Sequence, residues 1–345
     1  MKMFKQHKKF TIAIAMLILS AQSAICQDLH FSQFFEAPLL RNPSLAGIFI
    51  GDYRVQGVYR DQWNSITNGY RTGSLNAEYK MPVGQGNDFI TTGLQCLFDK
   101  AGTVGLTTSE FLPALNYHKS LSEEKTMYLS LGFMGGIVDK SIDRSKVTTS
   151  NQYNNGVFNP AIADGETFPS ANIHYWDASV GMSFNTTFGE EQKNSMFIGA
   201  AFHHLNRPKN SFYVDAIELD PKYVFSAGVK VNMDDNSYMT LQGDYSTQGG
   251  FKETIAGALY SYKLDDIKDP KYTLSIGAFL RWQDALIPVV KLDMLPVSIA
   301  LSYDVNISEL KTVSQGRGGV ELSISYIGFL SRESSSKYKV LCPHF

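Results

Sequence analysis

Few residues in this chain have the types and spacing that chemistry requires. The adjacent pair His203-His204 suggests a metal or catalytic site. Neighbouring residues on a strand point to opposite faces, so the two rings cannot easily share one ion. We therefore expect this pair to be structural, at the rim of the fold. Asp164-Gly165-Glu166 lacks the ligand spacing of an EF-hand and predicts a turn rather than a calcium site.

A hydrolytic site is no better supported. Hydrolases bring together a nucleophile, a base and an orienting group. Ser183 or Ser195 could be combined with His174 or His203, but no Gly-x-Ser-x-Gly motif occurs and nothing selects one serine over another. We predict that the protein is not an enzyme and that it uses no cofactor and no metal.

The remaining candidates suit the binding of a partner. Asn206 and Pro208 are loop-shaping residues, and Arg207 between them could pair with a carboxylate of a partner. Arg60 and Trp63 stand where a strand meets its loop; the alternative is an Arg60 that lines a lumen beside an interfacial Trp63. Asn306 lies in another connection. The candidate partner-binding residues are thus Arg60, Trp63, Asn206, Arg207, Pro208 and Asn306.

The first 26 residues predict where these side chains are delivered. Four lysines, at positions 2, 5, 8 and 9, precede an uncharged run over residues 10–21, and small residues then lead to Cys26 and Gln27. This is the pattern of a secretory signal peptide. The apolar run is short for a retained membrane anchor. A lipoprotein is disfavoured because Cys26 does not follow a Leu-small-small sequence.

The chain after the signal peptide repeats segments of about ten residues in which apolar and polar side chains alternate. Leu129, Leu131 and Phe133 show the pattern, as do Val180, Met182 and Phe184. Alternation with one apolar face is typical of strands that touch lipid on one side and a polar lumen on the other. Aromatic residues at segment ends, such as Trp176 and Trp282, suit interfacial girdles. The sequence predicts an all-β protein, a transmembrane outer-membrane antiparallel β-barrel; a periplasmic β-sandwich is the alternative.

We expect about 14 strands, and their even number tests the orientation. The expected strands are 51–60, 70–80, 89–99, 104–119, 126–138, 176–187, 195–205, 222–232, 238–246, 252–263, 271–282, 286–292, 296–304 and 317–329. An even count places both termini in the periplasm. The alternate connections are then all short on the periplasmic side, whereas the outward side has the three longest: 139–175, 206–221 and 305–316. Barrels of the outer membrane have this asymmetry.

These strands divide the chain into four parts: a signal peptide (1–26), an N-terminal periplasmic or plug-like segment (27–50), the barrel (51–330) and a C-terminal tail (331–345). The N-terminal segment carries Phe31, Phe34 and Phe35 and is too apolar for a free tail. We expect it to pack against the periplasmic end of the barrel or inside it.

Composition excludes other classes. The whole chain has a net charge of −2, and the signal peptide holds four of its lysines and no acid, so nothing suggests nucleic-acid binding. Cys96 and Cys342 alone would remain after cleavage, which is no disulfide framework. We expect Cys96 to be a buried or lipid-facing thiol.

Several blocks, in order along the chain, resemble the PorP/SprF family. They are residues 30–35 (His-Phe-Ser-Gln-Phe-Phe), 42–47 (Asn-Pro-Ser-Leu-Ala-Gly), 59–63 (Tyr-Arg-Asp-Gln-Trp), 203–208 (His-His-Leu-Asn-Arg-Pro), 302–308 (Ser-Tyr-Asp-Val-Asn-Ile-Ser), 318–323 and the final Cys-Pro-His-Phe, where His344 replaces the family's Arg. The resemblance implies an outer-membrane protein of type IX secretion or the linked gliding machinery.

Such a protein would help particular surface proteins to be secreted or to stay at the cell surface. Its implied partners are a secreted surface protein, periplasmic or peptidoglycan-associated secretion components and outer-membrane lipid, with no nucleic acid. The alternative function is a substrate-specific transporter or porin for a small solute, because charged residues at lumen-facing positions, such as Arg54, Lys230 and Arg281, would tune solute passage.

Overall fold

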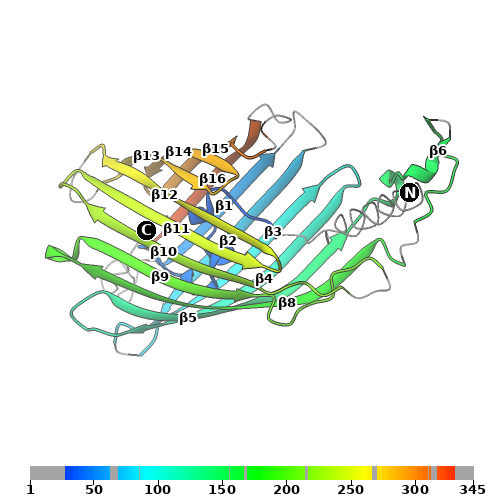
Figure 1. Cartoon of the computed structure of the whole chain (residues 1–345). Helices are drawn as coiled ribbons and strands as arrows, with labels where there is room; N and C mark the ends of the chain where they lie inside the picture. Colours follow the sequence, from blue (N-terminus) through cyan, green and yellow to red (C-terminus); the bar gives the residue numbers. More distant parts are fainter. Residues whose placement is uncertain are drawn as a thin grey trace, which may run out of the picture.

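The computed structural model describes residues 28–62, 69–84, 86–154, 156–166, 169–213, 217–265, 270–309, 311 and 317–330. Fourteen of its strands form a closed antiparallel barrel, which confirms the expected fold class (Figure 1). The barrel strands are β1 (Tyr53–Gln62), β2 (Tyr70–Pro82), β3 (Phe89–Ala101), β4 (Leu106–Ser120), β5 (Met127–Ser141), β8 (Asn172–Phe188), β9 (Asn194–His203), β10 (Lys222–Asn232), β11 (Ser237–Gln248), β12 (Phe251–Lys263), β13 (Tyr272–Arg281), β14 (Ala285–Met294), β15 (Val297–Asn306) and β16 (Arg317–Gly328). Each corresponds to one expected strand.

The alternation of side chains separates the two surfaces of the barrel wall. On β5, Leu129, Leu131 and Phe133 are exposed, whereas Ser130 and Met134 between and after them are buried. Each strand pairs with its neighbours in the chain, and β1 closes the barrel against β16. The outer surface is therefore apolar and the interior largely polar, as a barrel in a membrane requires. No helix in the described part of the chain is long and apolar enough to cross a membrane.

The two ends of the barrel differ in their connections. We call the end that carries the connections 142–171, 204–221 and 307–316 the loop end, and the opposite end, with its short connections, the turn end. The first of these connections contains a small hairpin that the sequence pattern did not predict, made of β6 (Tyr153–Asn154) and β7 (Val157–Phe158). Strands of two residues are too short to show alternation. Figure 1 shows this hairpin, labelled β6, standing clear of the barrel strands.

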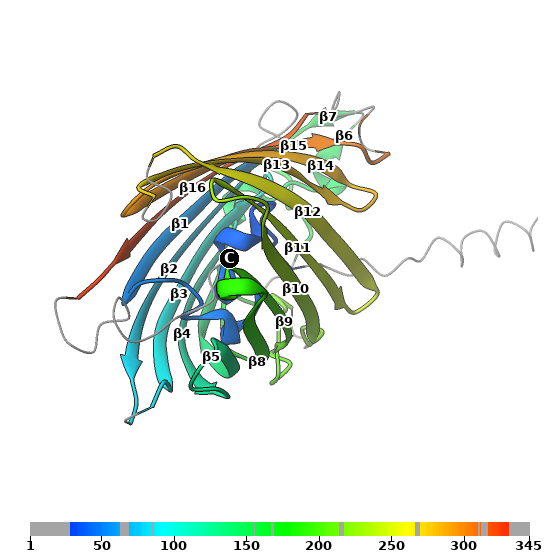
Figure 2. The same ribbon diagram turned by 90° about the vertical axis from the view of Figure 1, so that its left-hand side faces the viewer.

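The segment before β1, Asp28–Ile50, lies inside the barrel, and we call it the plug. It contains three short helical turns, η1 (Phe34–Glu36), α2 (Pro38–Arg41) and η2 (Pro43–Leu45), which are seen within the ring of strands in Figure 2. Most of its residues are buried. Of the two expected placements, inside the barrel is the one observed.

The plug begins at the loop end, whereas we expected the N-terminal segment on the side of the short connections. Asp28 contacts His204 and Lys222, which stand at the loop-end termini of β9 and β10. Gly47 contacts Glu78, near the turn end of β2. The chain therefore passes through the lumen from the loop end to the turn end before β1 begins. An even strand count fixes the ends of the strands but not the path of the segment that precedes them.

Candidate functional site

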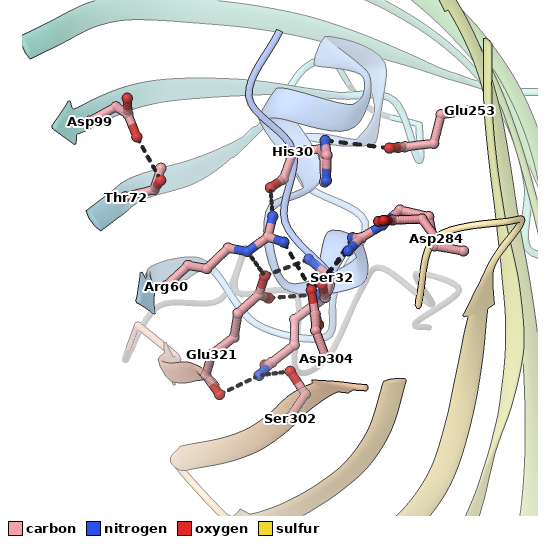
Figure 3. A network of polar contacts seen from close by, with 12 residues as sticks. His30, Ser32, Arg60, Thr72, Asp99, Glu253, Asp284, Ser302, Asp304 and Glu321 are labelled. Atoms are coloured by element: carbon pink, nitrogen blue, oxygen red, sulfur yellow. Dashed lines mark hydrogen bonds and ion pairs between the residues drawn. The ribbon is translucent and has the colours of Figure 1, made fainter. Parts of the chain in front are cut away.

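The interior of the barrel is where the charged residues meet, and the densest cluster lies at the loop end (Figure 3). Arg60 and Glu321 face one another because they are direct partners in the β1–β16 ladder. Arg60 Nε lies 3.1 Å from Glu321 Oε1, and both side chains are almost wholly buried. Asp304 Oδ2 joins this pair to β13, at 2.9 Å from Arg60 Nη2 and 2.8 Å from Arg281 Nη2.

The same cluster holds the backbone of the plug. The Glu321 carboxylate accepts the N–H groups of Ser32 and Gln33 at 2.6 and 2.7 Å. Arg60 donates to the carbonyl oxygen of His30, and Arg281 donates to the Ser32 hydroxyl. These contacts satisfy backbone groups that would otherwise be buried without partners. The wall thus binds this stretch of the plug largely through main-chain atoms.

Two further ion pairs fix the middle of the plug. Arg41 donates from Nε to both carboxylate oxygens of Asp244 at 2.7 Å, and its guanidinium lies 4.8 Å from the centre of the Phe34 ring. Glu36 accepts from Lys291 Nζ at 2.7 Å. Buried ions are tolerated when they are paired in this way, and removing one partner is costly.

The turn-end half of the plug fits the wall by shape. Asn42 donates to the carbonyl of Ala200 at 3.2 Å, and Asn116 donates to the carbonyls of Ser44 and Ala46 at 2.6 and 2.9 Å. Wall glycines make room for it: a Cβ on Gly181 would lie 1.9 Å from Asn42 Oδ1. Leu39 and Ala46 pack in an apolar cluster with wall residues of β4 and β5. The plug therefore contacts the barrel wall along its length.

The start of the plug is held by an ionic contact that we call the latch. His204 lies between Asp28 and Asp177, with Nε2 2.7 Å from Asp28 Oδ2 and Nδ1 2.9 Å from Asp177 Oδ2. Burial opposes the charge of the ring, but the hydrogen bonds and charges of the two carboxylates raise the pKa of His204 to about 10. Both ring nitrogens face carboxylates, which only accept, so the ring is the imidazolium.

The structure divides the six candidate partner-binding residues into two groups and brings no single site together. Arg60 lies in the lumen, the alternative considered for it, and Asn306 is buried at the loop end, accepting from Ser308. Asn206 and Arg207 are exposed beside the buried Pro208, in a turn fixed by a 2.6 Å bond from Asn206 Nδ2 to the carbonyl of Trp176. Trp63 lies outside the described residues.

The other sequence candidates do not converge either. His203 points to Ser179 at 3.0 Å, away from the latch formed by His204. Ser183 bonds to the plug at the carbonyl of Ser44, while His174 is largely exposed and pairs with Asp139. Among the described residues, no group of three His, Cys, Asp or Glu side chains is arranged to hold a metal ion.

The residues that the sequence reasoning missed are mainly acids. Asp28 and Asp244 form ion pairs between the plug and the wall, and Asp304 joins the wall residues Arg60 and Arg281; none of the three was singled out as a site residue. Charged residues inside an otherwise apolar stretch, such as Glu36 and Arg41, were the available signal, because a buried charge requires an opposite charge in the wall.

A closed, membrane-type β-barrel that encloses its own N-terminal segment belongs to the class of outer-membrane barrels. A family model of the type IX secretion system membrane protein PorP/SprF matches residues 23–326, so the chain belongs to this family. A search of the curated proteins finds no match.

Solved structures similar to this chain are also barrels. The toluene transporter TbuX of Ralstonia pickettii covers 84% of this chain with 92% of its own, at 10% identity and a TM-score of 0.47. A FadL homologue of Pseudomonas aeruginosa covers 84% with 94% of its own, at 10% identity and a TM-score of 0.43. CdiB from Acinetobacter baumannii covers 80% with 60% of its own, at 8% identity and a TM-score of 0.42. Likenesses at this level carry no argument about function.

Proposed function

We propose that this protein is a non-enzymatic component of type IX secretion that helps particular surface proteins, of adhesin or gliding type, to be secreted or retained at the cell surface. The observation that supports this role most directly is the plug inside the lumen. Glu321, Arg60 and Asp244 are all engaged by the plug or by one another, so these interior charges already have partners within the chain. The surfaces left for function are then the loops and turns.

The mechanism we propose is docking. The loop end carries the long connections, and exposed apolar side chains occur on them, including Tyr153, Val157 and Phe158 of the small hairpin. Loops on a rigid scaffold are the usual place for binding residues. In this scheme the loop end holds a secreted surface protein, and the turn end faces periplasmic components of the secretion machinery.

Two experiments test the proposal. The first compares the surface and secreted proteins of a deletion strain with those of its parent. Loss of one or a few surface proteins, with other secretion intact, is the expected result. Loss of all exported cargo would instead make the protein a core component. An unchanged set would contradict the proposal and favour the solute transporter.

The second experiment replaces residues 144–169 with a short flexible linker. Ile142 and Ala171 remain, and the hydrogen bond between them at 3.0 Å closes the β5–β8 ladder beneath the loop. The barrel should therefore still fold, as judged by its heat-dependent mobility in gels. The surface protein identified in the first experiment should be lost. Its retention would remove the main support for docking at this loop.

A further inference from the structure

A cavity of about 300 Å³ opens at the loop end, between the plug and the barrel wall. The plug contributes His30; the rest of the lining comes from the loop-end parts of β1, β12, β13, β14, β15 and β16 and from the turn between β13 and β14. Its charged lining residues are Arg60, Lys252, Glu253, Arg281, Asp284 and Asp304. We call it the mouth cavity; part of its lining is shown in Figure 3.

The mouth cavity is continuous with the contacts that hold the plug. Arg60 lines the cavity and also donates to the carbonyl of His30, and Arg281 lines it and donates to the hydroxyl of Ser32. Glu253 faces the His30 ring at 3.3 Å. A polypeptide already lies against these side chains, so their chemistry and spacing suit main-chain and side-chain groups of a peptide.

The charges that line the cavity also favour a peptide as its occupant. Three cationic and three anionic side chains line it, together with the amides of Gln62 and Asn306. A lining with balanced charge gives no preference for a single ion. Its exposed Lys252 offers a donor to the C=O groups or carboxylates of a peptide. Beyond His30 the plug continues into the lumen and is bonded to the wall, for example through Ser32 and Arg41.

We propose that the mouth cavity receives a polypeptide segment of the secreted partner, which lies beside the start of the plug. This inference rests on the proposed function and names the place where the partner engages. The volume is at the lower limit for ligand sites, about 300 Å³, which suits a few residues of an inserted loop or chain end rather than a whole domain.

The test uses a photoreactive amino acid at Lys252, which is exposed and lines the cavity. The matched control places it at Lys125, which is exposed in the turn between β4 and β5 at the other end of the barrel. The full-length protein is irradiated in intact cells. We expect an adduct from position 252, and none from position 125, that contains the surface protein lost from the deletion strain.

Other outcomes overturn the inference. A probe at position 252 that joins the chain only to itself would mean that a segment of this protein occupies the cavity. Equal amounts of adduct from positions 252 and 125 would mean that the partner contacts the protein non-specifically and not at the mouth cavity.

A second measurement does not depend on cross-linking. The charge reversal Lys252→Glu should reduce surface retention of the partner severalfold, whereas Lys125→Glu should leave it unchanged. If the deletion strain loses its surface protein but Lys252→Glu retains it fully, the mouth cavity is not the docking site and the proposed function stands. If the deletion strain loses nothing, the proposed function itself fails.

Discussion

Single charged residues inside the barrel determine how the plug is held there. Arg60 was a candidate for partner contact because it stands near the end of its strand, yet its side chain lies inside, where Glu321 and Asp304 neutralise it. Its position in the alternation of β1 fixes that direction. The exposed Arg207 has no comparable position in a ladder and stays available at the surface.

Glu321 should be the most sensitive of these residues. The change Glu321→Gln keeps the shape but removes the charge and leaves one amide nitrogen to meet the N–H of Ser32 or Gln33, donor against donor. Because Arg60 loses a buried partner, we expect destabilisation of about 3–5 kcal/mol. Urea unfolding in detergent measures it, with the exposed Glu123→Gln as control. Equal free energies of unfolding for Glu321→Gln and Glu123→Gln would show that the hydrogen bonds between Glu321 and the plug do not stabilise the protein.

The latch should make plug attachment depend on pH. A histidine whose pKa is raised by folding contributes its full stabilisation below its unfolded value of about 6.5, and loses it as pH rises towards the folded value. For His204 that window extends from about 6.5 to about 10. The groups that face it are Asp28 of the plug, Asp177 of β8, Glu110 of β4, His203 of β9 and, through Asp28, Lys222 of β10.

Hydrogen exchange of the first plug residues should therefore become faster, relative to the intrinsic rate, between these two pH values. His204→Asn should remove that dependence and give fast exchange throughout. The control is His174→Asn, which changes an exposed histidine that pairs only with Asp139 among the contacts described. If the wild type and His204→Asn show the same pH profile, the latch does not hold the plug.

At the scale of elements, the strands could be predicted from the sequence and the plug path could not. Alternation reports directly on which face of a strand is apolar, and all fourteen barrel strands follow it, with ends that differ by a few residues. The plug turns η1, α2 and η2 span only three or four residues each and have no periodicity. Their positions depend on contacts such as Ser32 with Glu321, 289 residues apart, which no local pattern reports.

The glycines of the wall give a test of how the plug and the barrel fit. A Cβ on Gly132 of β5 would lie 2.5 Å from the backbone of Pro43 and Ser44, so Gly132→Val should displace the plug. The matched control is Gly73→Val in β2, because the nearest atom to a Cβ on Gly73 would be 4.0 Å away. Limited proteolysis should cut the plug of Gly132→Val but not that of Gly73→Val, while the barrel strands of both variants stay uncut. Equal protection of the two plugs would mean that the fit is not tight.

For the whole molecule, the presence of the plug in the lumen favours an attachment scaffold over a pore. The wall residues that now bind the plug, among them Asp244, Glu321 and Asn116, are polar, and without it they would face water. A barrel lined in this way conducts ions when it is open. Part of the charged interior that suggested a transporter is thus engaged by the plug.

Removing the plug should open the barrel. We expect a variant that lacks residues 30–48, joined by a short linker, to conduct ions in planar bilayers, while the intact protein conducts little. Gel mobility before and after heating shows whether the shortened barrel folds, and Gly132→Val provides a second open form if it does not. High conductance of the intact protein would contradict a closed lumen and would favour the function of a solute transporter. If the open variants conduct and the surface protein is still retained, then attachment depends on the loop end alone and passage through the lumen has no part in it.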